Sequence, residues 1–170
     1  MAGYTKHICE KDIAEIKKSL KKYLSRLEPV IPYQYNFDTI KDLLYKYYPY
    51  EIYLINEKYN YYQVKEKSLI SKGNKSRYKF PKLDDLILNS GICKKYLSTE
   101  YEREHKKNFI VSKYQKNVQI FSAQRDPKIK RIFDKIEKNK LKTQQVEPEF
   151  LDSLMGLYDR KKLHKRIRFT

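Results

Sequence analysis

The stretch Pro49–Lys67, PYEIYLINEKYNYYQVKEK, decides the fold class predicted for this chain of 170 residues. Two runs within it, Glu51–Ile55 and Tyr59–Glu66, are rich in Ile, Tyr and Val, which favour β-strands. The polar residues between the two runs are typical of a turn. A third run of this kind, Arg77–Phe80, follows the turn signal at Gly73. The pattern predicts a meander of three strands.

Glu51, Gln63 and Lys65 form the candidate site of the predicted hairpin. If residue 52 pairs with residue 64, all three side chains share a face, whereas a two-residue loop shifts the register and separates them. Two oxygen ligands can hold Mg²⁺, which polarises a phosphate, and a lysine stabilises the developing charge. The trio is either a metal-dependent phosphodiesterase site, with Glu51 and Gln63 as metal ligands, or a surface that carries a Glu51–Lys65 ion pair.

Helical periodicity surrounds the predicted meander, and the whole chain is expected to be an α+β protein. A mixed sheet with the three-strand meander is flanked by helices, and the C-terminal part is helical. We expect one domain over residues 1–158 and a basic tail over 159–170. The predicted helices are Asp12–Leu27, Phe37–Tyr48, Leu83–Leu97, Asp126 to about Lys140, and Pro148–His164, and two further strands are Asn108–Val111 and Val118–Phe121.

The chain is strongly basic, with 38 Lys and Arg residues against 21 Asp and Glu and a net charge of +17. This excess repels itself in a compact fold unless a polyanion neutralises it, and it favours encounter with nucleic acid. Lysines outnumber arginines, which favours phosphate contact over bidentate reading of base edges. The composition predicts nucleic-acid binding through charge and shape.

Tyrosines are interleaved with these lysines. An exposed tyrosine can stack on a base, which contributes about 1–3 kcal/mol per base. Runs of positive charge are also typical of ordinary solvated faces, and only their combination favours a binding surface. The predicted nucleic-acid-binding residues are Tyr53, Tyr59, Tyr61, Lys67, Lys72, Lys75, Arg77, Lys128, Lys130, Arg131, Lys161, Lys162, Lys165, Arg166 and Arg168.

The predicted hairpin resembles the active-site hairpin of the PD-(D/E)xK nuclease superfamily. Glu51 matches the first acid of that family, Gln63 its second metal ligand and Lys65 its lysine. The surrounding order of helix, three strands, helix and strand is similar to the family core. The resemblance implies a Mg²⁺-dependent endonuclease with these three residues as its catalytic group. Without nuclease activity, no cofactor is expected.

Three functions remain open on the sequence alone. The chain is a basic nucleic-acid-binding protein within a viral or other nucleoprotein assembly, a Mg²⁺-dependent nuclease, or a basic inhibitor or adaptor that binds an acidic protein partner. Its two distant cysteines, Cys9 and Cys93, indicate neither a zinc site nor a disulfide framework. Since no apolar run reaches about 20 residues and no signal-peptide core is present, we expect an intracellular protein of the cytoplasm or nucleus, without membrane attachment.

Overall fold

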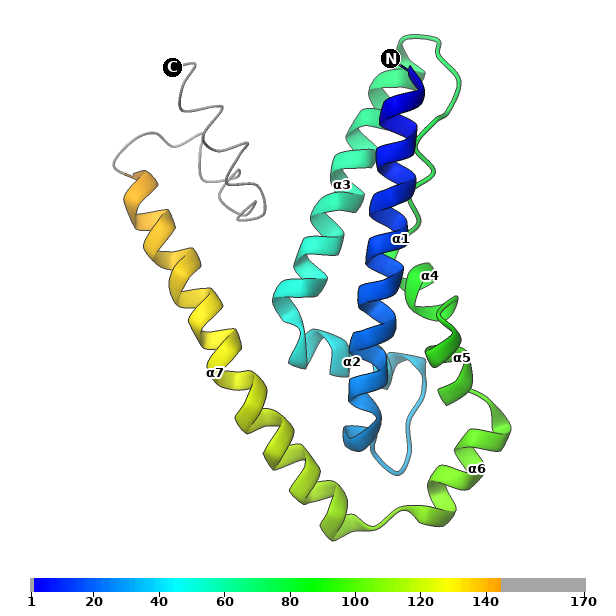
Figure 1. The fold of residues 1–170 in the computed structure, drawn as a ribbon, viewed down its shortest axis with the longest axis vertical. Coiled ribbons are helices and arrows are strands. Elements are labelled where there is room, and N and C mark those ends of the chain that lie inside the picture. The colour runs from blue at the N-terminus through cyan, green and yellow to red at the C-terminus, as the bar shows by residue number, and fades with distance from the viewer. Residues whose placement is uncertain (1, 145–170) are drawn as a thin grey trace. The chain divides into compact units, whose positions relative to one another are not determined.

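The computed structural model describes the backbone of residues 2–144, which form helices joined by short connections (Figure 1). The described residues contain no β-strand. None of the described helices is both long and apolar enough to cross a membrane. The elements are α1 (Ala2–Leu27), the 3-10 helix η1 (Glu28–Val30), α2 (Phe37–Tyr47), α3 (Pro49–Ser71), α4 (Leu83–Leu88), α5 (Gly91–Tyr96), α6 (Thr99–Asn108) and α7 (Val111–Gln144).

The α+β prediction is wrong, because the stretch expected to be a hairpin is the helix α3. Its buried residues Ile52, Ile55 and Tyr62 recur at spacings of three and seven, so they lie on one side of a helix. Ile and Tyr favour strands in isolation, but packing of this side against the core overrides that preference. The hairpin, the meander and the mixed sheet are all absent from the described chain, and Arg77–Phe80 lies in the connection between α3 and α4.

The first two predicted helices are confirmed, with one change at a boundary. Helix α1 begins well before its predicted start at Asp12, so Asp12 is an interior residue of the helix. Helix α2 begins at a capping box, in which the Asn36 side chain accepts from the Thr39 amide and the Thr39 side chain accepts from the Asn36 amide. The predicted helix Leu83–Leu97 is present as two short helices, α4 and α5.

The two later strands are also wrong. Residues 108–111 span the end of α6 and the start of α7, and Val118 and Phe121 lie on α7, where their spacing of three directs both toward the core. The helix predicted to start at Asp126 is present, but as the later part of α7. The predicted helix Pro148–His164 lies outside the described residues.

Helix α7 contains a proline in its interior, Pro127. Proline has no backbone N–H, so the carbonyl of Ala123 receives no bond from residue 127, and the proline ring crowds that carbonyl. The chain divides into two compact units between Ala123 and Gln124, at this weak point of the helix. All described core residues belong to the first unit.

Helix α1 organises the core of the first unit. It packs against η1, α2, α4 and α5. Leu20, Leu24 and Leu27 form its buried stripe and are at most 1% exposed. Full burial of one such side chain stabilises the fold by roughly 1.5–3 kcal/mol. The stripe is continuous at helical spacing, which explains why the sequence pattern identified this helix.

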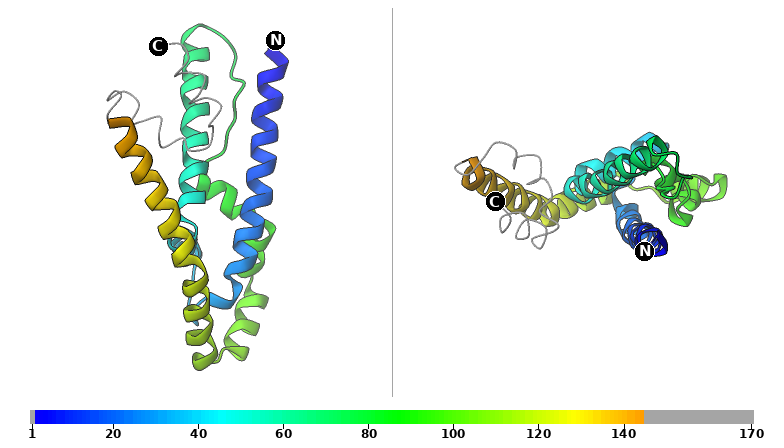
Figure 2. Two further views of the ribbon diagram at one scale, coloured as in Figure 1. Left: turned by 60° about the vertical axis from the view of Figure 1, so that its left-hand side comes forward. Right: turned by 90° about the horizontal axis from the view of Figure 1, so that it is seen from above.

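Helix α3 runs antiparallel to α1, and the connection that follows α3 turns back toward α4 (Figures 1 and 2). The turn is made at Gly73, whose positive φ of 72° suits glycine. Gly73 donates to the Ile70 carbonyl and Asn74 to the Leu69 carbonyl, the paired bonds of a Schellman motif. The glycine interpreted as a turn signal before the third predicted strand therefore marks the end of a helix.

Aromatic side chains and one ionic network join α1, α3 and this connection. The Phe80 ring stacks on Tyr62 at 5.1 Å between centroids, and Tyr78 lies 5.6 Å from the same ring. The Tyr62 hydroxyl donates to Asp12 at 2.6 Å, and the Lys58 ammonium contacts the other Asp12 oxygen at 2.6 Å. Burial and the bond to Asp12 raise the pKa of Tyr62. The hydroxyl is therefore protonated at neutral pH and can donate this bond.

Both cysteines are free and buried, at 2% exposure for Cys9 and 0% for Cys93. Cys9 belongs to α1 and Cys93 to α5. Burial raises the pKa of both thiols, and nearby carboxylates contribute for Cys9.

We expect Tyr62→Phe to lower the free energy of unfolding by about 1–3 kcal/mol, because it leaves a largely buried carboxylate oxygen of Asp12 without its donor. Urea denaturation at pH 7 measures the change. Tyr45→Phe, at a tyrosine that is 43% exposed, is the control and should change stability by less than about 0.5 kcal/mol. Equal effects of the two variants would contradict a structural role for the Tyr62 hydroxyl.

A second prediction concerns Glu66, which anchors the connection after α3. Its carboxylate accepts from the Tyr78 amide at 2.7 Å and from the Arg77 amide at 3.1 Å. Hydrogen bonds from the Ser76 side chain and from these amides lower the pKa of Glu66 below its ordinary value of 4.5. Its contribution to stability is therefore present above about pH 4.5 and is lost as the pH falls through the folded-state pKa.

Glu66→Gln should be less stable than the parent at pH 7, and the difference should disappear as the pH is lowered toward 3. Thermal melts at several pH values measure it. Glu15→Gln, an exposed substitution on α1, serves as the control. A difference that stays constant from pH 7 to pH 3 would show that the Glu66 charge does not hold the connection.

Candidate functional site: an aromatic pocket formed by η1, α6 and α7

The three predicted catalytic residues lie along one helix instead of across a hairpin. Glu51 is in the first turn of α3, and Gln63 follows twelve residues later, about 18 Å along the axis. Lys65 follows Gln63 on the same helix and is farther still from Glu51. The predicted alternative, a Glu51–Lys65 ion pair, is therefore not formed. The Lys65 ammonium lies 4.4 Å from the centroid of the Tyr61 ring. Within the described part of the chain, no group of three or more His, Cys, Asp or Glu residues could hold a metal ion.

The described residues among those predicted to contact nucleic acid lie on α3, in the connection after α3 and on the later part of α7. Tyr53 and Tyr59 are partly buried, with Tyr59 packed 6.4 Å from Phe80, whereas Tyr61 is 42% exposed. The cations Lys67, Lys72, Lys75 and Arg77 are exposed at the end of α3 and in the connection after it, and Lys128, Lys130 and Arg131 are exposed on α7 in the second unit. Lys161, Lys162, Lys165, Arg166 and Arg168 lie outside the described residues.

A pocket of about 340 Å³ in the first unit is the candidate site. It lies where η1 and the residue that follows it meet α6 and the beginning of α7. Its wall combines aromatic rings, carboxylates, a lysine and amides. The lining residues are Glu28, Pro29, Ile31, Tyr101, Glu104, His105, Asn108, Phe109, Ile110, Lys113, Tyr114 and Asn117.

Four aromatic side chains follow one another along the pocket, and we call Tyr101, His105, Phe109 and Tyr114 the aromatic row. Tyr101 and His105 are four residues apart on α6, so they lie on one face of the helix, with their rings stacked 6.0 Å apart. Phe109 follows the end of α6, 5.5 Å from His105, and Tyr114 returns from α7 to lie 5.3 Å from Phe109. The row offers ring faces and edges to a flat ligand.

Hydrogen bonds fix the orientation of the polar groups in this wall. His105 Nε2 is 2.9 Å from the carbonyl oxygen of Pro32, which can only accept, so Nε2 carries a proton. In the neutral imidazole Nδ1 is then an acceptor. The Asn117 amide donates to the Pro29 carbonyl at 3.3 Å. Both bonds tie α6 and α7 to the segment that follows α1.

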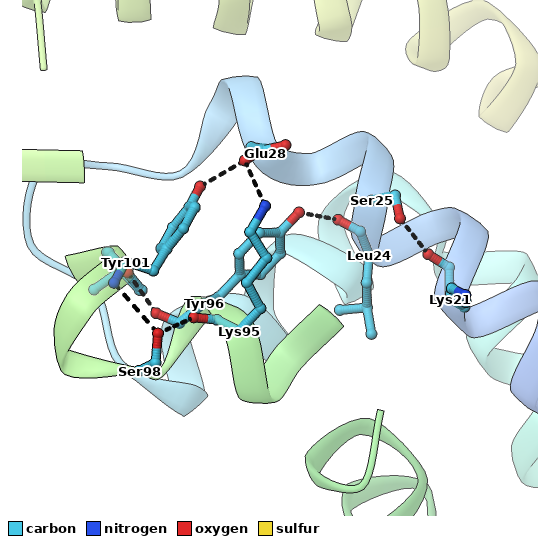
Figure 3. A network of polar contacts seen from close by, with 9 residues as sticks. Lys21, Leu24, Ser25, Glu28, Lys95, Tyr96, Ser98 and Tyr101 are labelled. Carbon is cyan, nitrogen blue, oxygen red and sulfur yellow. Dashed lines mark hydrogen bonds and ion pairs between the residues drawn. The ribbon is translucent and has the colours of Figure 1, made fainter. Parts of the chain in front are cut away.

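Glu28 connects the pocket to the core (Figure 3). It accepts from the Tyr101 hydroxyl at 2.9 Å, and the Lys95 ammonium lies 3.6 Å from the same oxygen. Burial and the bond to Glu28 raise the pKa of Tyr101. Beside it, the buried Tyr96 hydroxyl donates to the Leu24 carbonyl at 2.9 Å. Tyr96 thus attaches α5 to the end of α1, and Tyr101 attaches α6 to η1.

The sequence patterns did not identify this pocket. Residues 108–111 were predicted to be a strand, and His105 showed no partner at a ligand or catalytic spacing in the sequence. The four-residue spacing of Tyr101 and His105, continued at Phe109, is a signal for an aromatic face on a helix. Glu28 of η1 and Pro32 after it contact residues of α6 that are more than 70 positions away in the sequence. Patterns within one segment do not reveal such contacts.

Comparison with known proteins gives one informative similarity. The chain is 33% identical over 166 residues to the protein named "Putative cyclic ADP-D-ribose synthase TIR2" from Cytobacillus dafuensis. The aligned region covers 98% of this chain and 42% of that protein, so the chain spans less than half the length of this curated relative. No protein-family model and no solved structure matches the chain significantly.

This relative corrects the functional predictions. Its name describes a cyclic ADP-D-ribose synthase, whereas a PD-(D/E)xK nuclease was predicted, and the described part of this chain lacks the sheet that such a nuclease requires. The nucleic-acid-binding hypothesis, its viral or nucleoprotein setting and the inhibitor or adaptor hypothesis have no support in the relative either. The high positive charge misled the prediction, because charge reports on the surface and not on the fold or the reaction.

The network in Figure 3 predicts unequal effects for two conservative substitutions. Tyr96→Phe should lower the free energy of unfolding by about 1–2 kcal/mol, because the Leu24 carbonyl loses a buried donor. Tyr101→Phe should cost less than about 1 kcal/mol, since its bond to Glu28 is exposed to water. Chemical denaturation of both variants measures the two values, and the reverse order would contradict the arrangement described.

Proposed function

We propose that this chain is the helical part of a protein of the cyclic ADP-ribose synthase kind, and that its aromatic pocket binds the nucleotide that such a protein handles. Support for the first part is the relative, which aligns with nearly the whole chain. Support for the second is the aromatic row, the observation that carries the proposal.

The pocket offers a complement to each part of a nucleotide. The faces of Tyr114 and Phe109 can stack on adenine or nicotinamide, and a ring face also attracts the positive charge of an oxidised nicotinamide ring. The Lys113 ammonium can contact phosphate, and the exposed carboxylate of Glu104 can accept from ribose hydroxyls. A volume of about 340 Å³ is near the lower limit of ligand pockets, which favours one nucleoside half of a dinucleotide.

The geometry favours binding over cleavage in this chain. Enzymes that cleave glycosidic bonds usually place a carboxylate against the reacting carbon. Glu28 already accepts from Tyr101 and lies beside Lys95, and its side chain is 47% exposed. Glu104 is exposed. We therefore assign cyclisation to the portion of the relative that this chain does not span, and nucleotide recognition to the helical part.

Titration calorimetry with NAD⁺, ADP-ribose and cyclic ADP-ribose tests the proposal on the purified chain. Tyr114→Ala should weaken the binding of at least one of them by about tenfold or more, because it removes a stacking partner. Tyr45→Ala is the matched control, since it removes an equally large ring from an exposed site on α2 that does not line the pocket.

Two results would overturn the proposal. One is the lack of saturable binding of any of these nucleotides to the parent chain, and the other is equal binding by the parent and Tyr114→Ala. Release of nicotinamide from NAD⁺ by the chain alone, followed by chromatography, would overturn only the assignment of cyclisation to the rest of the relative.

A further inference from the structure

We infer that the segment 146–158 of this chain docks on an apolar stripe of α7, made of Ile129, Ile132 and Ile136. These residues lie in the second unit, at spacings of three and four that place them on one side of the helix. All three are half-buried, whereas Lys130 and Asp134 on the opposite side are exposed. The inference does not depend on the nucleotide pocket.

Charge distinguishes among the occupants that the stripe could accept. Residues 124–144 contain eight Lys or Arg and three Asp or Glu. Lys128 and Lys135, seven residues apart, lie on one flank of the stripe and are exposed. A second copy packed on the same stripe would bring an identical lysine flank into the interface, and like charges there oppose pairing. The surroundings favour an acidic occupant.

The segment 146–158, VEPEFLDSLMGLY, has the composition that this surface requires. It contains three acidic residues and no Lys or Arg. Phe150, Leu154 and Leu157 recur at spacings of four and three, which predicts one apolar helical face. Pro148 suits the first turn of a helix and separates this pattern from α7. The charge of segment 146–158 is opposite to that of residues 124–144, and its apolar residues recur at the same spacings of three and four as those of the stripe.

Chain length permits the contact. Three residues separate Gln144, the end of α7, from Pro148, which is within the range of short connections between antiparallel helices. A helix of eleven residues over 148–158 would span about 16 Å, and the stretch 129–139 of α7 spans about 15 Å. An antiparallel return would place Leu154 and Leu157 near the level of Ile136.

Hydrogen–deuterium exchange of the full chain tests this inference. Backbone amides of 146–158 should exchange at least tenfold more slowly than unstructured amides of the same sequence. The pair Ile132→Ala and Ile136→Ala should remove that protection, because it truncates the stripe without changing charge. The pair Lys130→Ala and Asp134→Ala is the matched control on the opposite side, and it should retain the protection.

A reciprocal variant separates docking from a change in α7 itself. Leu154→Asp should release 146–158 while α7 keeps its own helical protection. Exchange of 146–158 at the unstructured rate in the parent, or equal protection in the stripe variant, would overturn the inference. Protection that appears only at high protein concentration, together with dimers in sedimentation, would overturn it in favour of a second copy.

Discussion

The burial of one side of α1 is the interaction on which the first unit depends. Leu20, Leu24 and Leu27 are withdrawn from water almost completely, and η1, α2, α4 and α5 pack around that helix. The candidate pocket depends on the same stripe, because η1 continues directly from α1 and because Tyr96 fastens α5 to the Leu24 carbonyl. Contacts with η1 and the end of α1 therefore hold the pocket and the helices beside it in position.

Tyrosines make up a large part of the buried core. Tyr47, Tyr48, Tyr62 and Tyr96 are at most 2% exposed, and burying such rings supplies apolar area that a lysine-rich chain would otherwise lack. Each buried hydroxyl also needs a partner, and those of Tyr62 and Tyr96 find one in a distant part of the chain. The tyrosines therefore specify which helices meet as well as filling the space between them.

The sequence allowed prediction of α1 and α2, where apolar residues recur with the helical period and polar residues cover the other side. The prediction of strands at α3 was wrong, because Ile and Tyr have strand preferences and because polar and apolar residues alternate over short runs there. Two boundary signals were also ambiguous: Gly73 suits both a hairpin turn and a helix end, and Pro127 suits both a helix start and a helix interior that tolerates a missing bond. The pocket was not predictable, because its walls come from segments far apart in the sequence.

The reactivity of the two buried thiols can be used to measure local opening of the fold. A thiol reacts as its thiolate and only when a reagent reaches it, so Cys9 and Cys93 are both silent while their surroundings stay closed. Cys9 lies in the first half of α1, in the part of the helix that meets α3, and Cys93 lies on α5. The labelling rate at each cysteine therefore reports how often that particular region opens, and a cysteine introduced at the surface would react long before either of them.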